Sequence, residues 1–457
     1  MPEKSRPRVL FVAPSAYLLG GLAVWLDYLL PGLRAGGWDA ILGLVEGPRH
    51  HRPEQYLQIH PDVQSLRIAC QTGTAIGRRH ALRKAYHDYQ PDLVISVNIP
   101  DSIIAAAQMP SRVRPRTLFA CHGIQSDLFA DMAFLAESLD GVACTNRLAC
   151  RLSGQLGTVP PERVYYAPCG TLPAAVYQIQ NQEIFTVAYV GRLEQDQKRV
   201  LDLVPILTRL VAQGVNAQLL IAGNGPDETL LREHFAAAGL LDRVRFLGHV
   251  SSAAIPTEVY HYADALLITS LWETGPIVIW EAMAHQVPIV SSAYVGSGIE
   301  SALIHRKNAL LFPIGDCVTA SQMLLELRSS PELGDGLRSQ SMKTFQDRYT
   351  LEKSVRSWDS AMRAVLQGTP RGAKTFDGPR QNSRLDRVLP PDAAETLRRW
   401  TGRKSSDSGA GGEWPHSVTG GQTNEDVFWE IAKRLDSSQE PSPLGDSNGD
   451  GCSPGFQ

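Results

Sequence analysis

The chain has 457 residues, of which 43% are hydrophobic and 20% charged, so at about 150 residues per domain it is long enough for two or three domains. Its formal net charge of −3 at pH 7 argues against a nucleic-acid-binding protein, which usually carries a basic excess. The seven cysteines are scattered, odd in number and without a C-x-x-C pair. This usage argues against a disulfide framework or a zinc site, and it favours a cytoplasmic protein.

The N-terminus begins with basic side chains and continues with an apolar run, as signal peptides do. Pro14 and the glycine pair at 20–21 interrupt that run. A buried strand at 8–13, a glycine turn and an amphipathic helix over 22–35 therefore describe this segment better. No apolar stretch reaches about 18 uninterrupted residues, so we expect no membrane-spanning helix.

Apolar strand-like runs alternate with helical stretches through the first part of the chain. After the strand at 8–13 the runs are DAILGLV, LVISV, RTLFAC and GVACT. Buried strands that alternate with helices are typical of a parallel sheet covered by helices. We therefore assign residues 1–171 to an N-terminal Rossmann-like domain of the α/β class.

The pattern weakens in a polar linker at 172–184 and then starts again. The runs of this second series are FTVAYVG, AQLLIAG, VRFLG, ALLITS and PIVSS, with helices between them. Helical patterns at 317–328, 332–347 and 351–366 follow. We assign 185–350 to a second Rossmann-like domain and 351–371 to a closing helix. Two doubly wound domains joined by a linker place a ligand cleft between their facing carboxyl edges.

Residues 372–457 are rich in Gly, Ser, Pro and Asp and carry too few apolar side chains to form a core, which predicts a mostly disordered tail. One island at 424–435 has Asn424 as a candidate N-cap and an apolar stripe on one face. Two interpretations of the island remain, a helix docked on the folded part and a transient helix in a disordered tail. The surrounding composition favours the transient helix.

Two glutamates, Glu273 and Glu281, stand eight residues apart in LWETGPIVIWEAMA, directly after the strand-like run ALLITS. That position is the carboxyl edge of a parallel sheet, where open sheets bind ligands. Pro276 suits the start of the helix that follows. The amides expected to point into the cleft as an anion site are those of Gly275, Ile277 and Val278. A carboxylate nearby can accept both hydroxyls of a vicinal diol.

Two cations, Arg192 and Lys198, follow the first strand of the second domain in GRLEQDQKR. A forked arginine and a point-charge lysine beside a glycine suit a diphosphate, although a solvated loop is the alternative. After the first strand of the first domain, Gly21 lets backbone approach a phosphate from the opposite wall. The glycine pair there is not part of G-x-G-x-x-G, which argues against a nicotinamide dehydrogenase.

In this order, the segments GRLEQDQKR, LLIAGNGP, VRFLGHV, YADALLITSLWETGPIVIWEAMAHQVPIVSS and NALLFPIGD resemble the donor-binding half of the family-4 glycosyltransferases, which have the GT-B fold. The resemblance covers about 8–370 and is dense over 186–316. It implies two Rossmann-like domains facing a cleft, the first for the acceptor and the second for the donor. It also implies a retaining transfer, expected to be of a hexose, from a nucleotide diphosphate sugar without metal or cofactor.

The resemblance also assigns roles to single residues. Arg192 and Lys198 would hold the donor diphosphate. Glu281 would bind the ribose hydroxyls, and Glu273 would contact the donor sugar near the reacting carbon. The remaining expected contacts are Gly21 with the phosphates, His122 (in FACHGIQSD) with the donor sugar, and the backbone near His249 and Val250 with the base.

The chain departs from the family pattern at three places. Thr274-Gly275-Pro276 follows Glu273 where the family often has G-F-G, and the proline removes one amide. Cys169 stands where asparagine is usual before the glycine, and Arg199 stands where glycine is usual after the lysine.

The acceptor is not specified by these residues. A basic cluster in 77–89, formed by Arg78, Arg79, Arg83 and Lys84, suits an anionic membrane that carries a lipid-linked acceptor, whereas a solvated helix face is the alternative. We expect a cytoplasmic enzyme of polysaccharide biosynthesis, and peripheral contact with the inner membrane face stays open as one of these two interpretations of the cluster. The competing interpretations are a GT-B-fold epimerase or phosphorylase and a non-catalytic, nucleotide-sugar-binding scaffold whose tail recruits partners.

Overall fold

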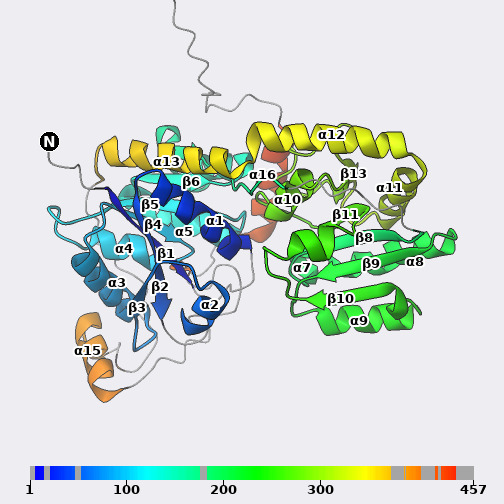
Figure 1. Ribbon diagram of the computed structural model, residues 1–457. Coiled ribbons are helices and arrows are strands. Elements are labelled where there is room, and N and C mark those ends of the chain that lie inside the picture. The colour runs from blue at the N-terminus through cyan, green and yellow to red at the C-terminus, as the bar shows by residue number, and fades with distance from the viewer. Residues whose placement is uncertain are drawn as a thin grey trace, which may run out of the picture.

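The computed structural model describes residues 6–14, 21–46, 53–174, 183–371, 385, 388–402, 417–419 and 424–438. These residues form two parallel sheets with helices packed on them, one sheet in each half of the molecule (Figure 1). The strand order is β3-β2-β1-β4-β5-β6-β7 in the seven-stranded sheet and β10-β9-β8-β11-β12-β13 in the six-stranded sheet.

The first half alternates strands and helices along the chain. Its strands are β1 (Arg8–Pro14), β2 (Asp39–Glu46), β3 (Ser65–Ala69), β4 (Leu93–Val97), β5 (Arg116–Cys121), β6 (Gly141–Cys144) and β7 (Val164–Tyr166). Its helices are α1 (Gly21–Ala35), α2 (Pro53–Ile59), α3 (Ala75–Tyr89), α4 (Asp101–Ala107), α5 (Ser126–Leu135) and α6 (Arg147–Gln155). Strand β1 pairs in parallel with β2 and with β4, so the strand order reverses beside β1. Open sheets bind ligands at such a point.

The second half repeats this plan. Its strands are β8 (Phe185–Val190), β9 (Ala217–Ala222), β10 (Val244–Gly248), β11 (Ala265–Ile268), β12 (Ile289–Ser292) and β13 (Leu310–Phe312). Its helices are α7 (Gln195–Lys198), α8 (Leu203–Ala212), α9 (Glu228–Ala237), α10 (Ile277–Ala284), α11 (Cys317–Ser329) and α12 (Pro331–Arg348). Strand β8 pairs in parallel with β9 and β11, which gives this sheet the same switch point.

Short helices complete the connections of both halves. The 3-10 helices are η1 (Ala136–Ser138), η2 (Pro161–Arg163), η3 (Val200–Asp202) and η4 (Leu241–Arg243), and η5 (Pro256–Tyr260) is a π-helix. Helix α12 lies over the second half, and α13 (Leu351–Gln367) returns over the first half, where it packs on α1 and β5 (Figure 1). The predicted helices at 317–328, 332–347 and 351–366 are therefore confirmed as α11, α12 and α13.

Two crossings between the halves lie within the described residues, near 169–171 and 349–351, and they are hydrogen-bonded to each other. Thr171 N donates to Tyr349 O at 3.1 Å, and Leu351 N donates to Thr171 O at 2.8 Å. A Cβ at Gly170 would lie 2.6 Å from Thr350 O, so glycine is required there for the close backbone approach. Cys169 is buried at this crossing, and burial raises the pKa of its thiol to about 12.

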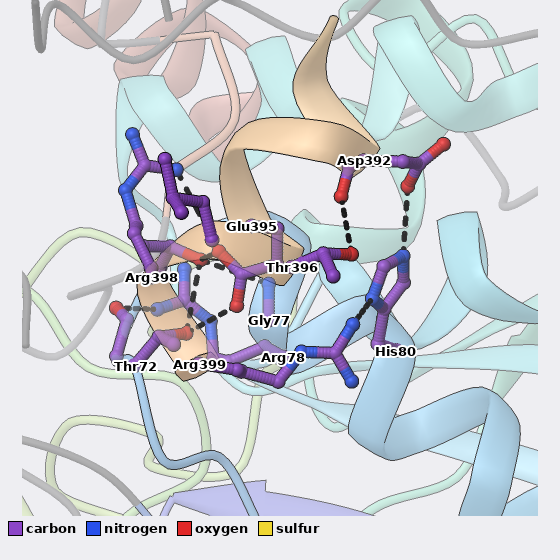
Figure 2. A network of polar contacts seen from close by, with 12 residues as sticks. Thr72, Gly77, Arg78, His80, Asp392, Glu395, Thr396, Arg398 and Arg399 are labelled. Atoms are coloured by element: carbon purple, nitrogen blue, oxygen red, sulfur yellow. Dashed lines mark hydrogen bonds and ion pairs between the residues drawn. The ribbon is translucent and has the colours of Figure 1, made fainter. Parts of the chain in front are cut away.

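Parts of the C-terminal region are docked on the folded halves. Figure 2 shows helix α15 (Pro391–Thr401) against α3, with Glu395 turned toward Thr72 and Asp392 toward His80. The buried Glu395 carboxylate accepts from Thr72 Oγ1 at 2.5 Å and from Thr74 Oγ1 at 2.7 Å. A charge buried in this way is tolerable because both carboxylate oxygens have hydrogen-bond donors.

The island at 424–435 forms helix α16 (Glu425–Ser437). Asn424 is its N-cap, as predicted, and its side chain accepts from Asp426 N at 3.0 Å and from Val427 N at 3.4 Å. Phe428 and Ala432 are buried against the folded halves, so the interpretation of a transient helix is wrong and the docked helix is correct. Composition misled here because the apolar surface that orders α16 belongs to other elements. Within the predicted disordered tail, 385, 388–402 and 417–419 are also described, and the remaining tail residues lie outside the described part of the chain.

The basic cluster of α3 is not a surface patch. Arg78 Nε and Arg79 Nε lie 2.9 and 2.7 Å from the two carboxylate oxygens of Asp101, and all three residues are buried. Lys84 is exposed and pairs with Asp88. A membrane patch that includes Arg78 and Arg79 is therefore wrong, because a helix-face pattern does not distinguish a solvated arginine from one paired inside.

The sequence also led us to expect no membrane-spanning helix and no disulfide framework. Among the described helices, none combines the length and the apolarity needed to cross a membrane. The six cysteines in the described part of the chain are free thiols.

Candidate active site

The turn after β11 touches the first half of the molecule directly. Thr274 Oγ1 donates to His122 O at 2.6 Å, and Thr145 Oγ1 donates to Thr274 O at 2.9 Å. Gly275 has a φ of +88°, and a Cβ there would lie 3.2 Å from Thr145 O. Glycine therefore supplies both the left-handed backbone and the room for this approach. The predicted turn and the segment of the predicted His122 meet across the interface of the two halves.

Glu273 is buried beside the predicted lysine. Lys198 Nζ donates to Glu273 Oε1 at 2.6 Å, and Ser270 Oγ donates to the same oxygen at 2.6 Å. Glu273 is only 6% exposed. The structure thus brings together two residues that the sequence placed in separate roles. A diphosphate arriving at Lys198 would share this cation with the Glu273 carboxylate.

The carboxyl edge of the second sheet also presents the start of α10. Pro276 is the N-cap residue, and α10 begins at Ile277. The amides of Ile277 and Val278 therefore lie in the first turn, where no intrahelical carbonyl can accept from them. Gly275 N precedes them in the turn. The positive end of the helix points out of the sheet edge here, which is where a phosphate binds most readily.

Glu281 lies in the second turn of α10 and is 8% exposed. Tyr260 OH donates to Glu281 Oε2 at 3.2 Å. Burial raises the pKa of Glu281 to about 7, against the opposing effect of this hydrogen bond. Its carboxyl is therefore close to half-protonated at neutral pH. Hydroxyl donors from a ligand would favour the ionised form.

Two tyrosines near Glu281 carry no signal in the sequence. Tyr260 belongs to η5, and Tyr28 belongs to α1 of the first half. The pKa of Tyr28 is raised by burial and then by Glu281, while hydrogen bonds to Ser252 and Thr171 oppose the rise. Tyr28 therefore reaches from the first half to the neighbourhood of Glu281. Only the tertiary structure places it there, because nothing in its spacing relates it to α10.

His122 is held as a neutral ring against two tryptophan side chains. Its ring centroid lies 4.1 Å from that of Trp25 and 6.2 Å from that of Trp358, with which it is stacked. Burial lowers the pKa of His122 to about 3. Its Nε2 is buried and makes no hydrogen bond within the described part of the chain. A buried ring nitrogen of this kind suits one hydroxyl of a ligand.

Arg192 lies toward the rim of the same edge, where it pairs with Glu194. Tyr189 OH donates to Arg192 O at 2.8 Å. The pKa of Tyr189 is raised by burial first and then by Glu273, and Arg192 opposes the rise. Arg192 and Glu273 therefore both lie near Tyr189, although the guanidinium faces Glu194.

Arg199, which stands where the resembled family usually has glycine, adopts a backbone conformation that favours glycine. Arg199 ends α7 with a φ of +50°, in the left-handed region that favours glycine. This explains why a glycine is usual after the lysine. The arginine tolerates the position and pairs with Asp202 at 2.8 Å.

The predicted base-binding segment follows β10. His249 is exposed, and its pKa is lowered by partial burial and by His60, the residue after α2, so it faces the first half of the molecule. Val250 packs against the main core cluster. Gly21 is the exposed first residue of α1, and no described contact joins it to the other predicted site residues. Gly20 lies outside the described residues.

A buried glutamate that sequence reasoning missed joins the halves behind the site. Glu300 accepts from Tyr166 OH at 2.5 Å, from Tyr349 OH at 2.7 Å and from Arg147 N at 2.9 Å. Its fourth contact is with Arg348 Nη2 at 2.8 Å. A single glutamate in a loop carries no pattern that distinguishes it from a solvated one.

The comparison with protein families agrees with this geometry. Residues 184–329 match the family model of the glycosyl transferases group 1. Over this segment, which is less than half of the chain, the protein is therefore similar to the glycosyl transferases group 1. The segment holds Lys198, Glu273 and Glu281, three of the ionisable side chains described above. The recognised glycosyltransferase resemblance is thereby confirmed, and the finer assignment to family 4 fits but stays a prediction.

Curated relatives match parts of the chain. The N-acetyl-alpha-D-glucosaminyl L-malate synthase of Bacillus anthracis is 27% identical over 211 residues, which are 46% of this chain and 53% of that protein. The lipopolysaccharide 1,6-galactosyltransferase of Escherichia coli (strain K12) is 25% identical over 242 residues, 52% of this chain and 66% of that protein. The chain thus spans between half and two thirds of the length of these relatives.

Solved structures show the fold. Anabaena Alr3699/HepE in complex with UDP-glucose is similar with a TM-score of 0.65 and 17% identity, over 78% of this chain and 99% of that chain. The sucrose-phosphate synthase of Thermosynechococcus elongatus is similar with a TM-score of 0.66 and 18% identity, over 79% and 99%. The predicted GT-B fold, with two Rossmann-like halves that face each other, is confirmed.

Proposed function

We propose that this protein is a glycosyltransferase that moves a sugar from a nucleotide diphosphate sugar to an acceptor. The observation that carries the proposal is the cluster of Lys198, Glu273 and the first turn of α10 at one sheet edge, in contact with the opposite half of the molecule. A cation and free helix amides suit a diphosphate, and the neighbouring carboxylates suit hydroxyl groups.

The proposed roles follow from chemistry at each atom. Lys198 Nζ and the amides of Ile277 and Val278 stabilise charge on the departing diphosphate. Glu281 accepts the ribose hydroxyls, and His122 Nε2 meets a sugar hydroxyl. Glu273 stands where the sugar gains oxocarbenium character. Arg192 reaches the diphosphate once it turns away from Glu194.

We further propose that the transfer retains the anomeric configuration and transfers a hexose. The acceptor hydroxyl attacks on the face of the leaving group, the bond between the anomeric carbon and the phosphate oxygen breaks, and the departing phosphate takes the proton. No second carboxylate nucleophile is needed in this scheme. No metal is needed either, because Lys198 and the helix amides oppose the diphosphate charge.

UDP-sugars are the first donors to test, because the similar Anabaena structure holds UDP-glucose. The acceptor class stays open among glycans, lipid-linked sugars and small molecules. The relatives act in lipopolysaccharide assembly and on L-malate, by their names, so anionic or membrane-bound acceptors belong in the first panel.

The test is thermal stability against nucleotide diphosphates and their sugars, with Lys198→Met and Glu281→Gln beside the wild type. A ligand at 100 times its dissociation constant stabilises by about 2.7 kcal/mol. The matched control is Lys343→Met, the same change at an exposed position of α12. We expect one nucleotide to shift the wild type and the control but neither site variant. No shift of the wild type at millimolar concentration contradicts the proposal.

The non-catalytic scaffold is the second candidate, and one observation favours it. Lys198 and Glu273 already neutralise each other, so the cleft is electrostatically satisfied without a ligand. Slow hydrolysis of the matching sugar nucleotide separates the candidates: an enzyme releases free sugar, a scaffold binds without turnover, and an epimerase returns a changed sugar nucleotide.

A further inference from the structure

The C-terminal strap, defined here as residues 417–419 and 424–438, packs on the first half of the molecule. The buried Asp131 carboxylate of α5 accepts from Val418 N at 3.1 Å and Thr419 N at 2.9 Å. Further along, the Phe428 ring stacks on Phe129 with 5.9 Å between centroids. These contacts are buried and specific, so the strap is part of the folded molecule.

The same strap packs on the second half. Trp429 lies 6.2 Å from Trp272 between ring centroids. The Asp436 carboxylate accepts three backbone amides of one turn: Gly296 N at 2.9 Å, Gly298 N at 3.3 Å and Ile299 N at 3.0 Å. Figure 1 shows α16 between the two halves. A carboxylate bound by several amides makes strong, charge-assisted hydrogen bonds.

The turn that Asp436 holds is attached to Glu273. Glu273 N donates to Val295 O at 3.1 Å, and Trp272 forms a parallel bridge with Val295. Gly296 also lies against the Glu273 backbone, since a Cβ at Gly296 would overlap Glu273 O. The path from Asp436 through this turn to the Glu273 backbone is therefore one of direct contacts.

We infer that the strap is a third component of the active site, and that Asp436 is a positioning residue for Glu273. Asp436 holds the turn at 295–299, this turn holds the Glu273 backbone, and the strap braces both halves next to their interface. The effect on catalysis rests on the proposed function of Glu273. The structural coupling between the strap and the Glu273 backbone does not rest on that proposed function, because its contacts are present without a ligand.

The chain offers a matched pair of substitutions on one helix. Asp436→Asn removes the charge and turns an amide nitrogen toward a backbone N–H, whereas Asp426→Asn makes the same change at an exposed position of α16. Gly298→Ala tests the contact from the other side. A Cβ there would lie 2.5 Å from Asp436 O, and its three nearest atoms all belong to Asp436.

The first test is amide hydrogen exchange of the full-length protein without ligand. Exchange is measured in peptides that cover 271–276 and 293–300. Asp436→Asn and Gly298→Ala should speed exchange about tenfold in both segments, and Asp426→Asn should leave both unchanged. Faster exchange in 293–300 alone, or in neither segment, would overturn the coupling. Gly298→Ala keeps the test valid if Asp436→Asn does not fold, since it leaves the strap sequence intact.

Steady-state kinetics with the donor found by thermal shift is the second test. Asp436→Asn should lower kcat about tenfold with KM changed less than twofold, because Lys198 and Glu281 still bind the donor. A fall in the melting temperature with unchanged kcat would overturn the positioning role. A wild type that turns over no sugar nucleotide, while the exchange result holds, would contradict the proposed function and leave the coupling intact.

Discussion

The two walls of the candidate site are built differently. The wall from the second half carries charge: Lys198 and Glu273 form an ion pair, and the buried Glu281 has a pKa of about 7. On the wall from the first half, by contrast, the predicted site residue His122 is uncharged and packs against Trp25 and Trp358, and we call this the neutral wall. Under the proposed function, the second half would bind the charged donor and supply the electrostatics of the reaction. The first half would then cover the sugar.

The largest effect should follow from Glu273→Gln, which keeps the size of the side chain and removes its charge. We expect kcat to fall about 10²–10³-fold, because Glu273 opposes the charge that develops on the sugar. Donor turnover at saturation measures this. Glu326→Gln, the same change at a surface ion pair with Arg306, is the control. A tenfold loss or less would mean that the charged wall does not carry the chemistry.

Lys198→Met should weaken both catalysis and the fold. Losing the cation leaves Glu273 buried with Ser270 as its remaining described donor, which costs about 2–3 kcal/mol since Lys198 is partly exposed. We expect kcat/KM to fall about 10²-fold. Chemical denaturation and donor kinetics measure the two effects. Unchanged stability together with unchanged kcat/KM would show that Lys198 contributes neither to the fold nor to catalysis.

The raised pKa of Glu281 predicts a pH dependence of donor binding. Burial holds the carboxyl protonated below a pKa of about 7, and ribose hydroxyls need the ionised form. Affinity should therefore rise as pH increases toward 7 and level off above it, by about tenfold per pH unit on the acid side. Calorimetry with a sugar nucleotide between pH 5.5 and 8.5 measures this. Glu281→Gln should bind weakly and without this slope; an equal slope in both proteins would place the titrating group elsewhere.

On the neutral wall the expected effects are smaller. His122→Phe keeps an aromatic ring against Trp25 and Trp358 and removes Nε2. We expect kcat/KM to fall about tenfold, the effect of one lost hydrogen bond, with a melting temperature within a few degrees of the wild type. A loss as large as that of Glu273→Gln would contradict the division between a charged and a neutral wall.

The smallest effect should come from metal removal. Excess EDTA should leave donor turnover unchanged, because Lys198 and the α10 amides supply the charge that a metal otherwise provides. Added Mg²⁺ should give no rise. A loss of turnover that Mg²⁺ or Mn²⁺ restores would show that the charged wall is incomplete without an ion.

Residue patterns predicted much of the fold because buried parallel strands are continuous apolar runs. The runs at 185–191 and 265–270 became β8 and β11, and the helix expected over 22–35 became α1. The two sheets lie within the ranges assigned to the two domains, while the exact boundaries stay predictions. Site residues in the segments that follow strands, such as Lys198 and Glu273, could be predicted for the same reason, since the carboxyl ends of parallel strands share one edge.

What the sequence determined by itself is therefore local: the βα order, the edge that carries Glu273 and Glu281, and the Asn424 cap. The tertiary structure alone decided which partners the charges find. Arg78 and Arg79 pair inside with Asp101, Asp436 accepts from the amides of Gly296, Gly298 and Ile299, and His122 is uncharged because it is buried against tryptophans. These outcomes depend on burial and on contacts between segments far apart in the chain, and a local pattern contains neither quantity.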